Sequence, residues 1–218
     1  MTNRLALFDC DGTMVDSQHN ICASMDRAFK SHDLTPPDHH LVRRIVGLSL
    51  QEAMRQLLPE ADNDLVMSLT ESYKNGFVAL REAGGVHEPL YDGLENLIDR
   101  LHNEGWMLGV ATGKSDRGLN FVVEAHGLKE RFVTLQTADR HPSKPHPAMV
   151  EVAIAEAGAS PETTAMIGDT SFDMEMAVNA GTRAIGVDWG YHDKHELIAA
   201  GAEIVASDMD HLYGILNQ

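Results

Sequence analysis

Short hydrophobic runs alternate with amphipathic segments along most of the chain. The runs are almost continuously apolar, a pattern typical of strands that are buried on both faces of a parallel sheet. We therefore predict six strands, over Leu5–Phe8, Met107–Ala111, Phe132–Leu135, Ala165–Ile167, Ala184–Val187 and Glu203–Val205.

The segments between these strands, from about residue 88 onward, have a helical hydrophobic period and end at a glycine. Glycine just after the last periodic residue is the usual C-terminal cap of a helix. We predict helices over Asp92–Glu104, Asp116–His126, Ala148–Ala157 and Phe172–Ala180. Strands that alternate with helices predict an α/β fold with a doubly wound, Rossmann-like parallel sheet.

The segment after the first strand departs from this alternation, because it contains no convincing strand. Helical periods run through Ile21–Phe29 and Leu65–Leu80, and a capping box at Ser49 opens a helix through Leu57. A segment of this length is too long for a simple crossover. We expect an inserted α-helical cap domain over residues 17–85 and a core domain built from residues 1–16 and 86–218.

The composition is that of an ordinary globular domain, with an acidic balance. The 218 residues are 43% hydrophobic and carry a net charge of −16. Such a surface repels nucleic acids and anionic membranes, so we expect neither as a partner. Cys10 and Cys22 form no disulfide framework, and no signal peptide or membrane-length apolar run is evident, so we expect a cytoplasmic location. The oligomeric state is left open.

Chemically active residue types follow the predicted strands. In an open parallel sheet, ligands bind beyond the carboxyl ends of the strands. Carboxylates, a hydroxyl group, backbone amides and lysines are expected to meet there, from Asp9, Asp11, Thr112, Gly113, Lys114, Lys144, Asp169 and Asp173. The carboxylates of Asp9, Asp11 and Asp169 suit Mg²⁺, and Thr112 and Lys144 suit a phosphoryl group.

These motifs, in this order, resemble those of the haloacid dehalogenase-like (HAD) hydrolase superfamily. The residues concerned are Asp9-Cys10-Asp11-Gly12-Thr13, Thr112, Lys144-Pro145 and Gly168-Asp169-x-x-x-Asp173. The helical insertion resembles the C1 cap of that superfamily. Val187-Asp188-Trp189-Gly190-Tyr191 further resembles its phosphoglycolate-phosphatase-like branch.

The resemblance implies a role for each motif. Asp9 would be the nucleophile that forms an aspartyl-phosphate, and Asp11 the acid and base. Mg²⁺ would be held by the carboxylates of Asp9 and Asp169 and by the main-chain carbonyl of Asp11. Thr112 and Lys144 would bind the phosphoryl oxygens. Asp173 would orient Lys144 or a metal-bound water, although a helix N-terminal charge explains Asp173 equally well, with Ser171 as the N-cap.

Substrate contacts are expected from Gly12, Gly113, Lys114 and Arg43. The cap is expected to set specificity, and its polar candidates are Arg43, Arg44, Ser49, Gln51 and Arg55. Arg43 or Arg44 could meet a substrate carboxylate, which would fit phosphoglycolate, although helical arginines are often merely solvated or paired.

The resulting hypothesis is a Mg²⁺-dependent phosphatase for a small phosphorylated metabolite, with phosphoglycolate as the best guess. A sugar phosphomutase is the main alternative, because it would share the core motifs. A carbon–halogen hydrolase is disfavoured because it does not need Asp11. A phosphonatase would need a Schiff-base lysine, and the cap has only Lys30 and Lys74. A non-catalytic interaction protein on the same fold is disfavoured by the presence of all four motifs.

Overall fold

A six-stranded parallel sheet forms the centre of the structure, a computed structural model that describes residues 3–218. The strand order is β3-β2-β1-β4-β5-β6, which is a doubly wound arrangement and confirms the predicted fold class. All six predicted strands are present. Their bounds are β1 Asn3–Phe8, β2 Met107–Thr112, β3 Thr134–Thr137, β4 Ala159–Gly168, β5 Arg183–Val187 and β6 Ile204–Ala206.

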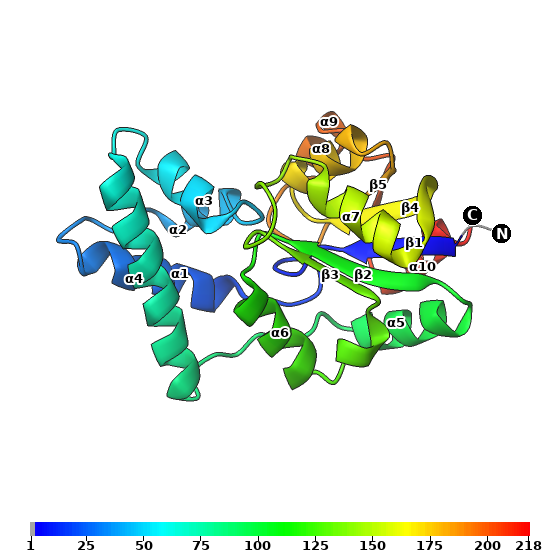
Figure 1. The fold of residues 1–218 in the computed structure, drawn as a ribbon, viewed down its shortest axis with the longest axis horizontal. Helices are drawn as coiled ribbons and strands as arrows, with labels where there is room; N and C mark the ends of the chain where they lie inside the picture. Colours follow the sequence, from blue (N-terminus) through cyan, green and yellow to red (C-terminus); the bar gives the residue numbers. More distant parts are fainter. Residues whose placement is uncertain (1–2) are drawn as a thin grey trace.

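Helices cover both faces of the sheet (Figure 1). Residues of α5 (Leu94–Asn103), α6 (Asp116–Ala125) and α10 (Met209–Leu216) share one hydrophobic cluster with one face of the sheet. Residues of α7 (Ala148–Ala157), α8 (Ser171–Asn179) and α9 (Lys194–Ala199) share a second cluster with the other face. Both faces of the strands are therefore buried, which explains why the strands are almost continuously apolar.

The bounds of several elements differ from the expected ones, and the start of β3 shows why. β3 begins at Thr134 rather than at Phe132. A single 3₁₀ turn over Lys129–Arg131 precedes it, and Phe132 packs into the core from the connection between the two. Hydrophobicity alone does not distinguish a buried connection from the start of a strand.

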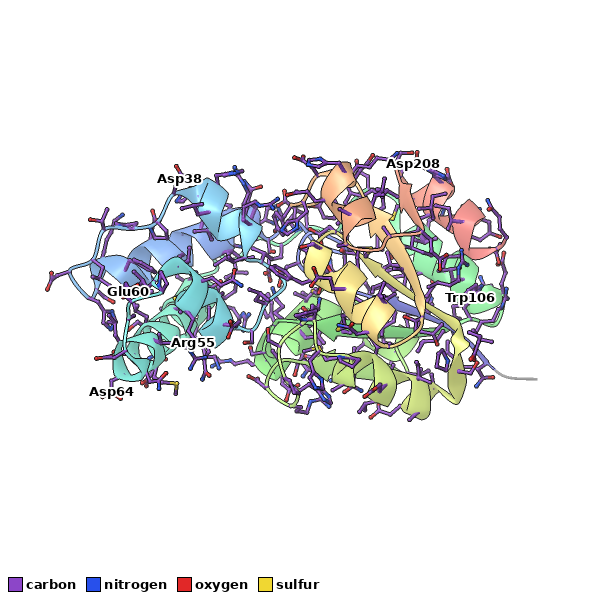
Figure 2. All side chains as sticks on the ribbon, turned by 90° about the horizontal axis from the view of Figure 1, so that it is seen from above. Asp38, Arg55, Glu60, Asp64, Trp106 and Asp208 are labelled. Atoms are coloured by element: carbon purple, nitrogen blue, oxygen red, sulfur yellow. The ribbon has the colours of Figure 1, made fainter. Side chains whose placement is uncertain are left out.

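Four helices between β1 and β2 pack on one another beside the sheet. They are α1 (Gln18–Lys30), α2 (His39–Arg44), α3 (Leu50–Leu57) and α4 (Asn63–Glu82). Their apolar faces share a separate cluster that includes Met25, Phe29, Met54 and Leu69. Acidic side chains such as Asp38, Glu60 and Asp64 lie on the outer parts of this unit (Figure 2).

The sequence analysis missed α2. Val42 is its only buried residue, so the helix has no hydrophobic period for a pattern to detect. Its N-terminus is stabilised by the Asp38 carboxylate, which accepts a hydrogen bond of 2.6 Å from the backbone N–H of His40. Capping and packing, rather than amphipathicity, hold this turn of helix.

The chain leaves and re-enters the core along two adjacent segments. Asp16 N donates to Pro89 O over 2.9 Å, and Tyr91 N donates to Met14 O over 3.0 Å. We propose that the helical unit is a cap domain over residues 17–85 and that residues 1–16 and 86–218 form the core domain, because this paired crossing lies between their separate hydrophobic clusters. None of the helices in the described part of the chain has the length and hydropathy needed to cross a membrane.

Candidate active site

The carboxyl ends of three adjacent strands bring the predicted residues together. Phe8 at the end of β1 is in register with Val110 of β2 and with Ile167 of β4. Asp9 therefore emerges between Thr112, the last residue of β2, and Asp169, which follows the end of β4. Parallel pairing thus assembles groups that are more than 100 residues apart in the sequence.

Three carboxylates form a buried cluster at this edge. Among residues 3–218, Asp9, Asp169 and Asp173 are fully buried, and each offers one oxygen within 4.8 Å of the others. The Asp169 carboxylate accepts hydrogen bonds from Thr13 Oγ1 at 2.8 Å and from Tyr191 N at 2.9 Å. These bonds hold Asp169 in place toward the cluster.

Lys144 supplies the positive charge within the cluster. Its Nζ lies 2.8 Å from Asp9 Oδ1 and 2.6 Å from Asp173 Oδ1, and its side chain is fully buried. Burial by itself lowers the pKa of Lys144, but the carboxylates of Asp173 and Asp9 outweigh that effect and raise the pKa above its ordinary value. The lysine is therefore held as a cation between the two carboxylates.

The Asp173 carboxylate contacts both Lys144 and the start of α8. Its Oδ1 holds Lys144, while its Oδ2 accepts from Thr170 Oγ1 at 2.6 Å and from Thr170 N at 3.1 Å. This is a capping box in which Thr170 is the N-cap of α8, so the expectation that Ser171 is the N-cap was wrong. The helix begins one residue earlier than predicted because Asp173 stands at the third helical position after Thr170.

Asp9 carries the least satisfied carboxylate of the site. Neither of its oxygens accepts a hydrogen bond of good geometry from a described residue, although Lys144 lies close to Oδ1. Burial and the neighbouring acids Asp173 and Asp11 raise the pKa of Asp9 to about 7, against the lowering effect of Lys144. Burial also raises the pKa of Asp169 well above its usual range, and the charge of Asp9 adds to it. The single positive charge of Lys144 cannot balance the three buried carboxylates. Their oxygens are ligands of the kind that a divalent cation such as Mg²⁺ prefers.

The Asp11 side chain lies outside the three-carboxylate cluster. Its Oδ1 lies 2.5 Å from Lys114 Nζ, which also lies 3.0 Å from Glu88 Oε1. Sequence reasoning missed Glu88, which is buried but belongs to no motif and follows the cap in an irregular segment. Lys114, an expected substrate contact, is therefore engaged by two acids.

At Gly12 and Gly113 a side chain would collide with neighbouring atoms, so both positions need glycine. Gly12 has φ = +89°, and a Cβ there would lie 2.3 Å from Asp169 Oδ2. A Cβ at Gly113 would lie 2.4 Å from Leu48 O and 2.5 Å from Gly47 O, which belong to the cap. Ser49 N, in the same cap loop, donates to Ser143 Oγ of the core at 2.8 Å. The cap loop is thus seated directly on the strand ends.

A cavity of about 700 Å³ lies between the cap and the core. Asp9, Asp11, Thr112, Gly113 and Lys114 line its core side, and Ser49 and Gln51 are among the residues that line its cap side. The structure does not bring Arg43, Arg44 or Arg55 to this cavity. Arg44 instead forms two contacts of 2.5 Å with Glu196 of α9, so neither Arg43 nor Arg44 is placed to meet a substrate there.

A Rossmann-like core, a helical insertion after β1 and acidic residues at strand ends that face a cavity are together the architecture of a capped hydrolase. The chain belongs to the haloacid dehalogenase-like hydrolase family, whose model matches residues 6–187. Its helical insertion lies where the sequence resemblance placed the C1 cap, between β1 and β2.

Similar proteins cover nearly the whole chain. The probable phosphatase IndB of Dickeya dadantii is 34% identical over 96% of this chain and 92% of its own length. A phosphoglycolate phosphatase of Mesorhizobium japonicum is 27% identical over 89% and 87%, respectively. The crystal structure of a predicted phosphatase from Clostridium acetobutylicum covers 100% of both chains, with 26% identity and a TM-score of 0.88.

Proposed function

We propose that this hydrolase is a Mg²⁺-dependent phosphatase that acts on a small phosphorylated metabolite through an aspartyl-phosphate on Asp9. The observation that carries the proposal is the Asp9 carboxylate. It lines the cavity, has no hydrogen-bond donor of good geometry among the described residues, and lies 2.8 Å from Lys144. The phosphatase names of the relatives support the same reaction.

In this mechanism an Asp9 carboxylate oxygen attacks phosphorus, and the bond from phosphorus to the leaving oxygen breaks. Asp11 gives its proton to that oxygen as it leaves. Asp11 then takes a proton from a water molecule, whose oxygen attacks the phosphorus of the aspartyl-phosphate. The bond from phosphorus to the Asp9 oxygen breaks, which releases inorganic phosphate and regenerates the Asp9 carboxylate. Thr112, at the end of β2, and Lys144, in the connection between β3 and α7, would bind the phosphoryl oxygens and stabilise their charge.

Asp9, Asp169 and the main-chain carbonyl of Asp11 would hold Mg²⁺, which would neutralise phosphoryl charge and help to orient the substrate. Asp173 reaches the same cluster, and its Oδ1 holds Lys144. We propose that Asp173 chiefly positions the lysine.

Phosphoglycolate is the first substrate to test, because relatives with 24–27% identity are named phosphoglycolate phosphatases. The sequence suggested Arg43 as the partner of its carboxylate, but Arg43 does not line the cavity. A carboxylated substrate would need a different cation.

The experiment compares Asp9→Asn with Asp11→Asn, using p-nitrophenyl phosphate and Mg²⁺. Its good leaving group needs little protonation, so Asp11→Asn should release a burst of nitrophenol and then stall, with a steady-state rate lower by roughly 10²–10⁴-fold. Intact mass should show one added phosphoryl group in Asp11→Asn and none in Asp9→Asn. An adduct on another residue, or equal labelling of both variants, would overturn the mechanism.

The same assays distinguish hydrolysis from a phosphomutase reaction. A phosphatase releases inorganic phosphate in equal amount to the alcohol, whereas a mutase returns the phosphoryl group to another hydroxyl of a sugar phosphate. We expect stoichiometric inorganic phosphate from the wild-type protein. Isomerisation of a sugar phosphate without phosphate release would contradict the proposal.

A further inference from the structure

Two arginines on the wall of the cavity take part in no salt bridge within the described part of the chain. Arg81, in the last turn of α4, and Arg117, in the first turn of α6, both line the cavity. Neither forms a salt bridge with any residue of the described range 3–218. The two lysines on the same wall differ, because Lys74 lies 3.7 Å from Asp139 and Lys114 is held by two acids. Arg117 is exposed, whereas Arg81 is half-buried, so the absence of an ion pair is the more unusual at Arg81.

Arg81 is held in place by aromatic rings rather than by carboxylates. Its guanidinium carbon lies 4.0 Å from the centre of the Phe121 ring and 5.5 Å from the centre of the Phe77 ring. Its Nε is buried and has no hydrogen-bond acceptor among the described residues. A guanidinium stacked in this way has lost part of its hydration while its N–H groups stay available, which suits it to bind a planar carboxylate through two hydrogen bonds.

The two arginines are close enough to affect each other. Burial is the main cause that lowers the pKa of Arg81; the carboxylate of Glu88 acts against it, and the positive charge of Arg117 lowers the pKa further. A structural clamp between α4 and α6 would explain the stacking of Arg81 on Phe121, but it would leave the buried Nε of Arg81 without an acceptor. An anion between the two would offset the repulsion between their positive charges.

The wall between these arginines and the aspartates is apolar and aromatic. It includes Tyr73, Phe77 and Val78 of α4. The Phe77 ring lies between the two charged regions, with its centre 5.8 Å from Lys114 Nζ and 5.5 Å from the Arg81 guanidinium carbon. A cavity of about 700 Å³ is also in the range that encloses ligands much larger than a two-carbon acid.

We infer that Arg81 and Arg117 bind a carboxylate at the end of the substrate opposite its phosphoryl group. The substrate class is a phosphate monoester of a carboxylic acid whose carbon body is longer than two carbons and has an apolar or flat face toward Phe77. This inference rests on the proposed phosphatase function and names the substrate class of that same site.

The test uses two substrates that differ in one carboxylate, phenyl phosphate and 4-carboxyphenyl phosphate. It uses three variants, Arg81→Gln, Arg117→Gln and the control Arg55→Gln. Arg55 is also on the cap (Figure 2), but it contacts Glu52 and Asn63 and does not line the cavity. Arg117→Gln is informative on its own, because it leaves the stacking of Arg81 on Phe121 intact.

We expect the wild-type protein to prefer 4-carboxyphenyl phosphate. Each cavity variant should lower kcat/KM for that substrate by about tenfold or more, mainly through KM, because a charge-assisted hydrogen bond is lost. The factor by which kcat/KM falls for phenyl phosphate should be about ten times smaller than the factor for 4-carboxyphenyl phosphate. Arg55→Gln should change kcat/KM for the two substrates by the same factor. Phosphoglycolate should be a poorer substrate than 4-carboxyphenyl phosphate.

Equal losses on both substrates would show that the arginines only support the structure, and would overturn the inference. It would also be overturned if the wild-type protein hydrolysed phenyl phosphate with no preference for the carboxylated substrate, while the proposed phosphatase function stood. Absence of hydrolysis of both, with no phosphoenzyme in Asp11→Asn, would overturn the proposed function and the inference together.

Discussion

The salt bridge between Arg44 and Glu196 joins the cap to the core and allows a quantitative prediction. The two Nη nitrogens of Arg44, on α2, each lie 2.5 Å from a carboxylate oxygen of Glu196, on α9. His192 Nε2 lies 3.1 Å from Arg44 O, so backbone and side chain of this arginine both contact the core. The hydrogen bonds from Arg44 are the main cause that lowers the pKa of Glu196 to about 2.

The expected energy follows from that pKa. A change from the ordinary value of 4.5 to about 2 would correspond to ~3 kcal/mol for a fully shielded group. The side chains of Arg44 and Glu196 are 34% and 25% exposed, so solvent screening reduces the expected contribution to about 1 kcal/mol. For a chain of this size, that is a change in Tm of about 2–4 °C.

The assay is a double-mutant cycle with Arg44→Gln and Glu196→Gln, measured by urea unfolding at pH 7. We expect a coupling free energy of about 1 kcal/mol. Arg183 and Glu203 provide a matched control within the core, because their contact of 3.2 Å is longer and more exposed, at 35% and 49%. The control pair should give a coupling below about 0.5 kcal/mol.

The sign of the pH dependence is fixed by the lowered pKa. Because the folded-state pKa of Glu196 is below its ordinary value of 4.5, the stabilisation is fully present above pH 4.5 and is lost as the pH falls towards about 2. The coupling should decline over this interval, down to the lowest pH at which unfolding stays reversible. A coupling no larger than that of the control pair, or one that does not change with pH, would refute the inferred contact.

Three further predictions concern the site. EDTA should abolish turnover and Mg²⁺ should restore it, while Ca²⁺ should inhibit because its coordination is larger and more flexible; full activity of the metal-free protein would contradict the metal assignment. Asp9→Asn should abolish turnover and leave the Tm of the metal-free protein equal or higher, because it removes a buried charge from a crowded acidic cluster, and a large fall in Tm by calorimetry would instead indicate a structural role. Gly113→Ala should lower kcat/KM by at least tenfold because its Cβ would displace the cap loop at Leu48 O, whereas Gly214→Ala, which meets no atom within 4 Å, should leave kcat/KM unchanged and stabilise α10 by about 0.5–1 kcal/mol.

The sequence by itself was sufficient to predict most of the local structure. The strands, the α7 helix over Ala148–Ala157 and the Ser49 N-cap of α3 each depend on residues a few positions apart, so a single segment contains the information needed. The full capping box expected at Ser49 was wrong, because the Ser49 backbone N–H donates to Ser143 Oγ of the core instead of to Glu52. The family motifs were also visible, because each is short and stands next to a strand. The parallel pairing of those strands then places Asp9 beside Thr112 and Asp169.

Only the tertiary structure decided which charges are paired and which are free. Arg44 and Glu196 are 152 positions apart and Lys114 and Glu88 are 26 positions apart, and no local pattern connects either pair. The same packing leaves Arg81 facing the cavity, although in sequence it resembles any other helical arginine. The spacing of hydrophobic residues along a helix determines which of its faces is buried. The partner of a charged side chain depends instead on how separate helices and loops pack together. We expect the contacts between the cap and the core to determine the substrate specificity of this enzyme.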